Sequence, residues 1–427
     1  MRLEIFRFRS FCSGEEYGSQ KLFILDAILI NAAVGITTGV ILSGYMLYLG
    51  ASDFLSALIN NSASFSAILC IFSFIFFEKK AKRKKILISM NLLSRTIFML
   101  ILAVPFIIEK EKTSFFLIAV LIVLSDVIFS IYRVGWLVWL MDIAPAKNKT
   151  NYIYMRMFYL RCAYAFVTLL SGFILDMFDK GFAGFAILFG SSYLLSLMDA
   201  IVLGRIREKG YILDSASKSL DRFLVPLKTK QYRDYLFFMF LFYFSFFISS
   251  AYTPVYMIKY LELDYKFILS MSVVSMIAMI LSNLMWMKVE QRSGSGFVLS
   301  TSTLMQALGL LIIGFLTDRT YYLFFFSSVI TGVGAGGFNT TSFSYRYELM
   351  PDVGKTIYES WFYLIFGVAS LIAPIAGQMV INIMPEFTNT VFHNSKIQLL
   401  YMVSFALLCL SAISASRVKK KEFIKTS

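Results

Sequence analysis

The stretch DIAPAKNKTNY at 142–152 returns as ELMPDVGKTIY at 348–358. Both copies begin with a carboxylate and keep Pro, Lys, Thr and Tyr at the same spacing, although they lie 206 residues apart. Each copy sits between two long apolar stretches. Self-similarity at a fixed distance indicates an internal repeat. If both copies emerge on the same side of a membrane, the chain consists of two similar halves in parallel orientation.

The composition requires a lipid environment. Of the 427 residues, 58% are hydrophobic and 15% are charged, which is more apolar surface than a soluble core of this size covers. A helix needs about 20 mostly apolar residues to span the hydrocarbon. Twelve stretches qualify, so we predict an all-α polytopic membrane protein with 12 transmembrane helices in two six-helix bundles. They are 22–49, 54–77, 86–108, 114–140, 152–175, 182–203, 235–258, 265–287, 297–317, 323–347, 356–383 and 397–416.

The distribution of positive charge predicts the orientation. Membrane proteins keep Lys and Arg on the cytoplasmic side. With the N-terminus inside, the cytoplasmic loops and tails carry 29 of these residues and the opposite loops carry 7. Both termini are therefore predicted to be cytoplasmic. The net charge of +14 follows from this topology and from anionic headgroups, so no nucleic-acid partner is needed.

The longest cytoplasmic loop divides the chain. This loop mixes both charge signs with Ser, Gly and a Pro. We predict an N-terminal bundle over 1–203, a cytoplasmic linker over 204–234 and a C-terminal bundle over 235–427. Such a linker lets two bundles rock against each other. A simple tether with an amphipathic surface segment is compatible with the same role.

The sequence carries no pattern of an enzyme. The four cysteines show no CxxC spacing, and no catalytic triad, metal cluster or phosphate loop is found. The glycine-rich run 332–337 has a dinucleotide-like spacing, but it lies inside an apolar stretch with no preceding strand. We interpret it as close helix packing. We therefore predict no enzyme activity, no cofactor and no metal.

Two motifs resemble those of the major facilitator superfamily. The loop from Glu78 to Lys84 reads EKKAKRK and is similar to that family's Asp-Arg-x-Gly-Arg-Arg-Lys loop, with Ala81 in place of the glycine. The family's first half also tends toward Asp-x-x-Pro-x-x-x-Arg-Gly-x-Tyr followed by Arg. The residues that match this second pattern are Asp142, Pro145, Tyr152 and Arg156. The resemblance implies a secondary transporter that works by alternating access.

Charged residues at the inner helix ends form a predicted cytoplasmic gate. Partly exposed ion pairs are typically worth about 0–1 kcal/mol each, so several together bias an equilibrium without locking it. The alternative is that these charges only mark the interface and orient helix ends. The predicted gate residues are Asp142, Arg156, Glu348, Glu78, Lys82 and Arg83.

Ionisable residues deep in apolar stretches are the candidate transport pathway. A charge at mid-bilayer costs at least about 2.5–3.5 kcal/mol and persists mostly where it is paired or faces a cavity. Arg95 and Asp126 lie at similar depth, so we predict that they are in contact. Asp126, Ser130 and Arg133 share one helix face, which the resemblance places at the cavity. A static pair that staples two helices is the alternative.

Further polar residues could line the same pathway. They are Asp26 and Asn31 in the first stretch, Arg161 in the fifth and Asn339 in the tenth. For Asp26, near the inner interface, we expect simple solvation. Arg161 is the best candidate to bind an anionic substrate group, with a lipid or intersubunit contact as the alternative. For proton coupling we rank Asp126 first and Asp26 second, because the sole histidine lies in an outer loop.

Three function classes remain open. Proton-coupled export of a small amphipathic compound leads, because the chain is rich in aromatic residues. A proton-coupled importer or a lipid-moving member of the superfamily follows, and a non-transporting membrane receptor comes last. The expected partners are a small-molecule substrate and membrane lipids. We expect a monomer in the cytoplasmic membrane.

Overall fold

The computed structural model describes residues 12, 15–70, 77, 82–108, 110–145, 149–208, 224–351, 355–387 and 394–415. Helices are the only regular secondary structure in these ranges. Eleven of them are long and apolar enough to cross a membrane, counted over the same residues. Glu78 of the predicted gate lies outside the described ranges.

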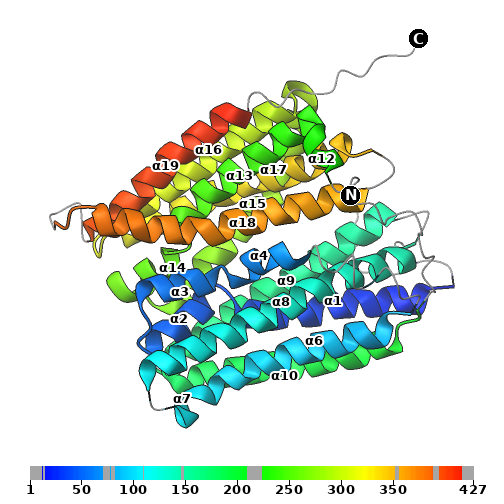
Figure 1. Cartoon of the computed structure of the whole chain (residues 1–427), viewed down its shortest axis with the longest axis horizontal. Coiled ribbons are helices and arrows are strands. Elements are labelled where there is room, and N and C mark those ends of the chain that lie inside the picture. The colour runs from blue at the N-terminus through cyan, green and yellow to red at the C-terminus, as the bar shows by residue number, and fades with distance from the viewer. Residues whose placement is uncertain are drawn as a thin grey trace. The chain divides into compact units, whose positions relative to one another are not determined.

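The helices group into two compact units. The first unit comprises 1–51 and 69–216, and the second comprises 52–68 and 217–427. In the first unit, α1 packs along α9 and α10, and α6 packs between α8 and α10 (Figure 1). Its helices are α1 (Tyr17–Thr37), α2 (Val40–Tyr48), α6 (Lys84–Met99), η4 (Leu100–Leu102), α7 (Val104–Ile107), α8 (Glu111–Ile143), α9 (Lys149–Met177) and α10 (Phe182–Arg205).

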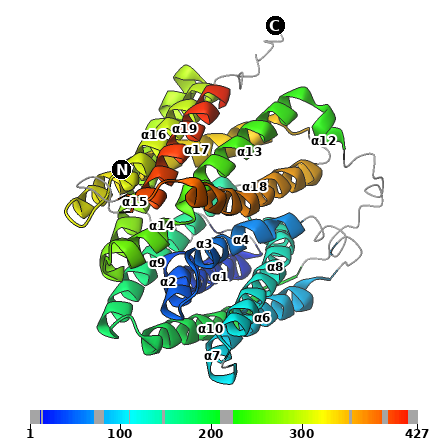
Figure 2. The same ribbon diagram turned by 60° about the vertical axis from the view of Figure 1, so that its left-hand side comes forward.

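The second unit contains the later helices together with one early segment. In both views α3 and α4 lie beside α18, although they come from residues 53–65 (Figures 1 and 2). Its elements are α3 (Asp53–Asn60), α4 (Ser62–Phe65), η3 (Ser66–Leu69), α12 (Val225–Lys228), α13 (Lys230–Ser250), α14 (Thr253–Val255), η5 (Tyr256–Tyr260), α15 (Tyr265–Ser293), α16 (Ser295–Gly314), η6 (Tyr321–Leu323), α17 (Phe324–Leu349), α18 (Lys355–Ile383) and α19 (Ser395–Ala415).

Three predicted spans are interrupted. The first stretch breaks at Thr38 and Gly39, where Gly39 has a φ of 64° that favours glycine. The second stretch begins as α3, α4 and η3, with a break at Asn61, so its described part holds no long helix. The seventh breaks after Ser250, to whose carbonyl Pro254 cannot donate, and it continues as α14 and the π-helix η5. Hydrophobicity locates these spans, but it does not reveal the breaks.

Each half has a hydrogen bond between its first and sixth helices, and the two bonds occupy equivalent positions. Ser192 on α10 donates to the carbonyl of Ala33 on α1 at 2.9 Å. Ser404 on α19 donates to the carbonyl of Ser245 on α13 at 2.6 Å. Both members of the second pair lie 212 positions after their counterparts. The sequence repeat therefore extends to the packing inside each half.

A second repeated bond joins the first and third helices of each half. The Tyr45 hydroxyl donates to the Ile101 carbonyl at 3.0 Å, and the Tyr256 hydroxyl donates to the Leu316 carbonyl at 2.6 Å. Each tyrosine is fully buried and joins the end of the first helix of its half to the end of the third. A buried hydroxyl needs a partner, and the ends of helices supply unsatisfied carbonyls.

Candidate functional site

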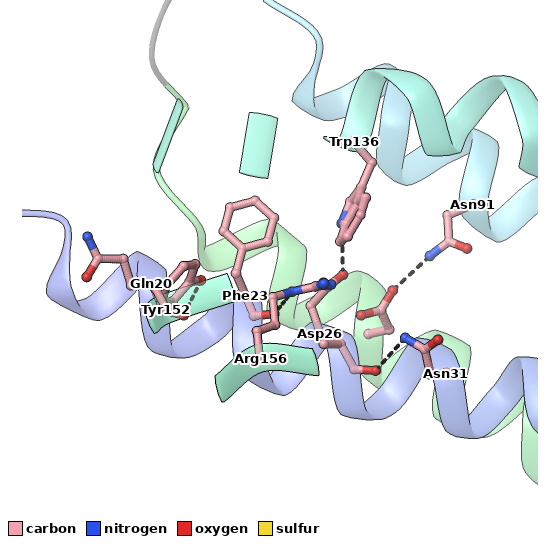
Figure 3. A network of polar contacts seen from close by, with 10 residues as sticks. Gln20, Phe23, Asp26, Asn31, Asn91, Trp136, Tyr152 and Arg156 are labelled. Atoms are coloured by element: carbon pink, nitrogen blue, oxygen red, sulfur yellow. Dashed lines mark hydrogen bonds and ion pairs between the residues drawn. The ribbon is translucent and has the colours of Figure 1, made fainter. Parts of the chain in front are cut away.

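An ion pair between α1 and α9 lies at the centre of the first unit. Arg156 Nη2 and Asp26 Oδ2 are 3.4 Å apart, and the side chains are 7% and 0% exposed. Trp136 Nε1 donates to Asp26 Oδ1 at 3.2 Å, and the Arg156 guanidinium lies 4.6 Å from the Trp136 ring centroid (Figure 3). The Arg156 Nε donates to the Phe23 carbonyl at 3.2 Å. The buried charges are thus paired and hydrogen-bonded, as burial requires.

This pair corrects two sequence expectations. Solvation of Asp26 is wrong, because its side chain is fully buried. Arg156 was placed in a partly exposed gate, but it lies inside the unit rather than at its surface. The sequence position one turn into an apolar helix indicated depth only, whereas the direction of the side chain depends on how α9 packs on α1.

Asp199 extends the cluster and was missed by the sequence analysis. It lies on α10, is 0% exposed, and accepts a hydrogen bond from Asn91 of α6 through Oδ2 at 2.9 Å. Its carboxyl is also within hydrogen-bond reach of the Asp26 carboxyl. The signal was available, because a lone acid in the apolar stretch 182–203 meets the same criterion that selected Asp126.

Arg95 lies beside this cluster. Its guanidinium is 4.1 Å from the centroid of the Phe129 ring, a cation–π arrangement between α6 and α8. Asp126 is the acid with the strongest electrostatic effect on it. Ser94 and Ser125 bond each other's carbonyls at 3.0 and 2.9 Å and hold α6 against α8. A direct Arg95–Asp126 contact stays a prediction.

The repeated element anchors the start of each half in a similar way. The buried Tyr152 hydroxyl donates to the Gln20 carbonyl on α1 at 2.9 Å, and Gln20 Nε2 donates to the Ile143 carbonyl at 3.1 Å. In the second half, Tyr232 on α13 donates to the Tyr358 carbonyl at 2.6 Å. The tyrosine of each copy therefore joins the fifth helix of its half to the first.

The remaining gate residues differ in burial. Asp142, Glu348 and Lys82 are exposed. Arg83 is buried, and its backbone N–H and that of Lys84 donate to the Glu208 carboxylate at the start of the linker. Their role as a gate stays a prediction.

The other predicted pathway residues do not join the cluster. Asn31 donates to the Ala27 carbonyl of its own helix at 2.8 Å, and Asn339 in the second unit is exposed and donates to Met279 Sδ at 3.7 Å. Arg133 is exposed and Arg161 is partly buried. Among the residues that the structure describes, no three of the types His, Cys, Asp and Glu gather at a potential metal site.

The second unit holds an ion pair that the sequence analysis did not select. Arg346 Nε on α17 lies 3.2 Å from Glu359 Oε1 on α18, and the side chains are 7% and 19% exposed. The Arg346 guanidinium lies 3.7 Å from the Phe362 ring centroid. Aromatic rings continue from there, with Tyr243 of α13 4.7 Å from Phe366 of α18.

A polar contact also joins the early segment of the second unit to its first long helix. Asp53, at the start of α3, accepts from Lys259 Nζ at 2.6 Å and from the Tyr260 hydroxyl at 2.5 Å. Both partners belong to η5. In the predicted topology these residues lie at the outer surface.

Comparison with known proteins agrees with this architecture. The family model described as Major Facilitator Superfamily matches residues 235–423, and solved transporters of the same fold cover nearly the whole chain. The later part of the chain, residues 235–423, therefore matches the Major Facilitator Superfamily. The predicted resemblance to this superfamily and the all-α polytopic fold are thereby confirmed.

Three solved structures of Major Facilitator Superfamily type illustrate the likeness. A nucleoside transporter NupG mutant is 13% identical, with a TM-score of 0.72 over 94% of this chain and 100% of its own. A D-xylose-proton symporter is 11% identical, with a TM-score of 0.73 over 95% of this chain and 98% of its own. The peptide transporter family member PepTSo is 12% identical, with a TM-score of 0.71 over 93% of this chain and 97% of its own. Identities this low establish the fold alone. No curated protein matches the sequence.

Proposed function

We propose that this chain is a proton-coupled secondary transporter that exports a small amphipathic compound by alternating access. The observation that carries the proposal is the buried cluster around the Asp26–Arg156 ion pair in the first unit. Ionisable groups inside a membrane are costly and are retained mostly for transport or proton relay. The structural relatives include carriers of nucleosides, sugars and peptides, so a small molecule is the expected cargo.

The amphipathic character of the substrate is inferred from the second unit. There α13, α17 and α18 present stacked rings, with Phe242 and Phe338 only 3.7 Å apart and Phe362 beside the Arg346 guanidinium. Aromatic faces bind apolar and cationic groups, and the neighbouring ion pair offers a polar contact. A compound with one apolar and one polar part suits this combination.

Proton-coupled import is the second candidate. The D-xylose-proton symporter, by its name, moves substrate and proton in the same direction, and its fold is as similar to this chain as that of the other relatives. The same buried carboxyls serve either direction, because alternating access is reversible. We place the protein in the plasma membrane with both termini in the cytoplasm.

Accumulation of fluorescent amphipathic dyes in cells distinguishes these functions. Cells that express an exporter retain less dye, and an uncoupler of the proton gradient restores the dye level. Cells that express an importer accumulate more dye, and the uncoupler lowers it. The Lys396→Gln variant is a matched control, because Lys396 pairs with the exposed Glu386 far along the chain from the buried cluster. Dye binding to the purified protein without any movement across the membrane supports a receptor and overturns the proposal.

A further inference from the structure

We propose that Asp26 and Asp199 form a proton-binding site in which the two carboxyls share one proton, carried by Asp199 in the structure described. Both side chains are fully buried, on α1 and α10, which pack along each other. The existence of this site is independent of transport, whereas its use in coupling rests on the proposed function.

The hydrogen-bond partners of the two acids are unequal. Asp26 receives a donor on each oxygen, from Trp136 and from the cationic Arg156. Asp199 receives one neutral donor, from Asn91 on Oδ2, and Oδ1 has no donor. An ionised carboxylate only accepts hydrogen bonds, so two carboxyls within reach of each other need a proton between them. Because Asp26 is already satisfied as an anion, the proton belongs to Asp199.

The charged and titratable groups around the two carboxyls do not remove the need for a proton between them. The groups that face the pair are Arg156 of α9, Arg95 of α6 and Tyr132 of α8. Arg156 is engaged with Asp26, and Arg95 lies against the Phe129 ring with its Nε and Nη2 without partners. The Tyr132 hydroxyl also lacks a partner. No cation therefore donates a hydrogen bond to the free oxygen of Asp199, so a second buried anion there would lack a hydrogen-bonded cation of its own.

The pair is not a requirement of the fold. The shift of 212 positions that relates the Ser192–Ala33 and Ser404–Ser245 bonds carries Asp26 to Phe238 and Asp199 to Ser411. The second half thus builds the same packing of first and sixth helices without an acid at either equivalent position. The two carboxyls are an addition to one half, as expected of a functional site.

Release of the proton from Asp199 would change the electrostatic interactions between the two acids and the neighbouring arginines. Asp199 would become a second anion beside Asp26 and would attract Arg95, while Asp26 stays paired with Arg156. Arg95 lies on α6, so its movement would alter the contact of α6 with α10. The proton comes from water and returns to water, with no other reactant. Proton binding is thereby linked to helix packing within the first unit.

Infrared spectroscopy of the purified full-length protein tests the site without any substrate. We expect a protonated-carboxyl band at neutral pH that shifts when the protein is labelled with ¹³C-aspartate. The band should decrease in Asp199→Ser, which introduces the residue found at the equivalent position of the second half, and in Asp199→Asn. The exposed-pair variant Glu386→Gln should keep it. A wild-type protein without an aspartate-sensitive band overturns the proposal, as does a band that Asp199→Ser and Asp199→Asn leave unchanged.

Transport assays in proteoliposomes then test whether the proton site is used in coupled transport. Asp199→Asn should abolish accumulation of the dye driven by an imposed pH gradient, whereas Glu386→Gln, in the exposed pair with Lys396, should leave this accumulation within about twofold of wild type. Loss of the infrared band with gradient-driven transport intact overturns the coupling role of Asp199. A band that depends on Asp199 in a protein that moves no dye supports the proton site and counts against the proposed function.

Discussion

At the scale of single residues, burial decides what each charge contributes. Asp26 and Arg156 are almost completely shielded from solvent, whereas Asp142 and Glu348, which the sequence pattern singled out, are exposed. Exposed pairs are worth little, but removal of one partner from a buried pair leaves an uncompensated charge. The sequence motif therefore lies close to the buried pair in the chain. Replacing Asp26 or Arg156 should cost more stability than replacing Asp142 or Glu348.

Replacing Arg156 should destabilise the first unit. Arg156→Leu leaves the buried Asp26 carboxylate without its cation, so we expect a loss of about 3–5 kcal/mol of folding free energy. Thermal unfolding in detergent measures the change. Lys396→Leu, which breaks the exposed pair with Glu386, should alter the melting temperature very little. Equal melting temperatures for Arg156→Leu and wild type would contradict the assigned ion pair.

Cys12 should react slowly with thiol reagents at neutral pH. Burial raises the pKa of its thiol to about 11, with Lys21 opposing the shift. Because the thiolate is the nucleophile, the alkylation rate should rise about tenfold per pH unit until the pH reaches this pKa. The check is a pH series of alkylation on a variant whose other cysteines are replaced. The same variant unfolded in denaturant serves as control, and equal rates in both states at neutral pH would show that Cys12 is not shielded.

At the scale of helices, close approach depends on residues without side chains. A Cβ added at Gly332 of α17 would collide with the Ser275 carbonyl of α15. The glycine-rich run thus has the packing role that the sequence analysis gave it. The proline and glycine breaks act at the same scale, because they redirect a helix that hydrophobicity alone would leave straight.

Gly332→Ala should push α15 and α17 apart. Overpacking of a close helix contact costs about 1–3 kcal/mol, and the obstacle here is backbone that cannot rotate away. Gly190→Ala is the matched control, since its nearest neighbour, the Met99 methyl, lies at an ordinary 3.9 Å from the added Cβ. Detergent melting curves of both variants test the difference. The expectation fails if Gly332→Ala is as stable as Gly190→Ala.

The contacts of Asp53 should restrain the outer end of α3. Asp53→Asn weakens the bonds to Lys259 and Tyr260, and such partly exposed contacts contribute about 0–1 kcal/mol each. We expect a several-fold increase in the labelling rate of Ser56→Cys, whose native side chain is fully buried, with a membrane-impermeant thiol reagent. Lys396→Gln in the same Ser56→Cys background should leave the rate unchanged. A rate in Asp53→Asn no higher than in this control would argue against the restraint.

At the scale of the whole molecule, the repeat relates two units that are similar inside but different in charge. The serine and tyrosine bonds occur in both halves, yet the acids Asp26 and Asp199 occur in one. The two halves therefore share a packing scaffold, while the buried acids Asp26 and Asp199 lie in the first half only.

The orientation of the chain gives the prediction at this scale. Single cysteines at Asp142 and Glu348 should both react with an impermeant reagent in inside-out vesicles and not in intact cells, because the repeat and the positive charges place both on the cytoplasmic face. A cysteine at Lys110, in an outer loop, should show the opposite pattern. Reaction of positions 142 and 348 from opposite sides would contradict the parallel repeat.

The sequence by itself determined the helical class, the location of the spans and the relation between the halves. Apolar length and repeat spacing are local properties along the chain, so they are readable without a structure. It also selected Arg95, Asp126 and Asp26 as ionisable residues in apolar stretches, and Arg156 by its place after the repeated motif. Only the tertiary structure decided that Asp26 pairs with Arg156 and meets Asp199, because these contacts join α1, α9 and α10 across more than a hundred residues. Which faces of three helices meet depends on side-chain packing, and no single stretch of sequence contains that information.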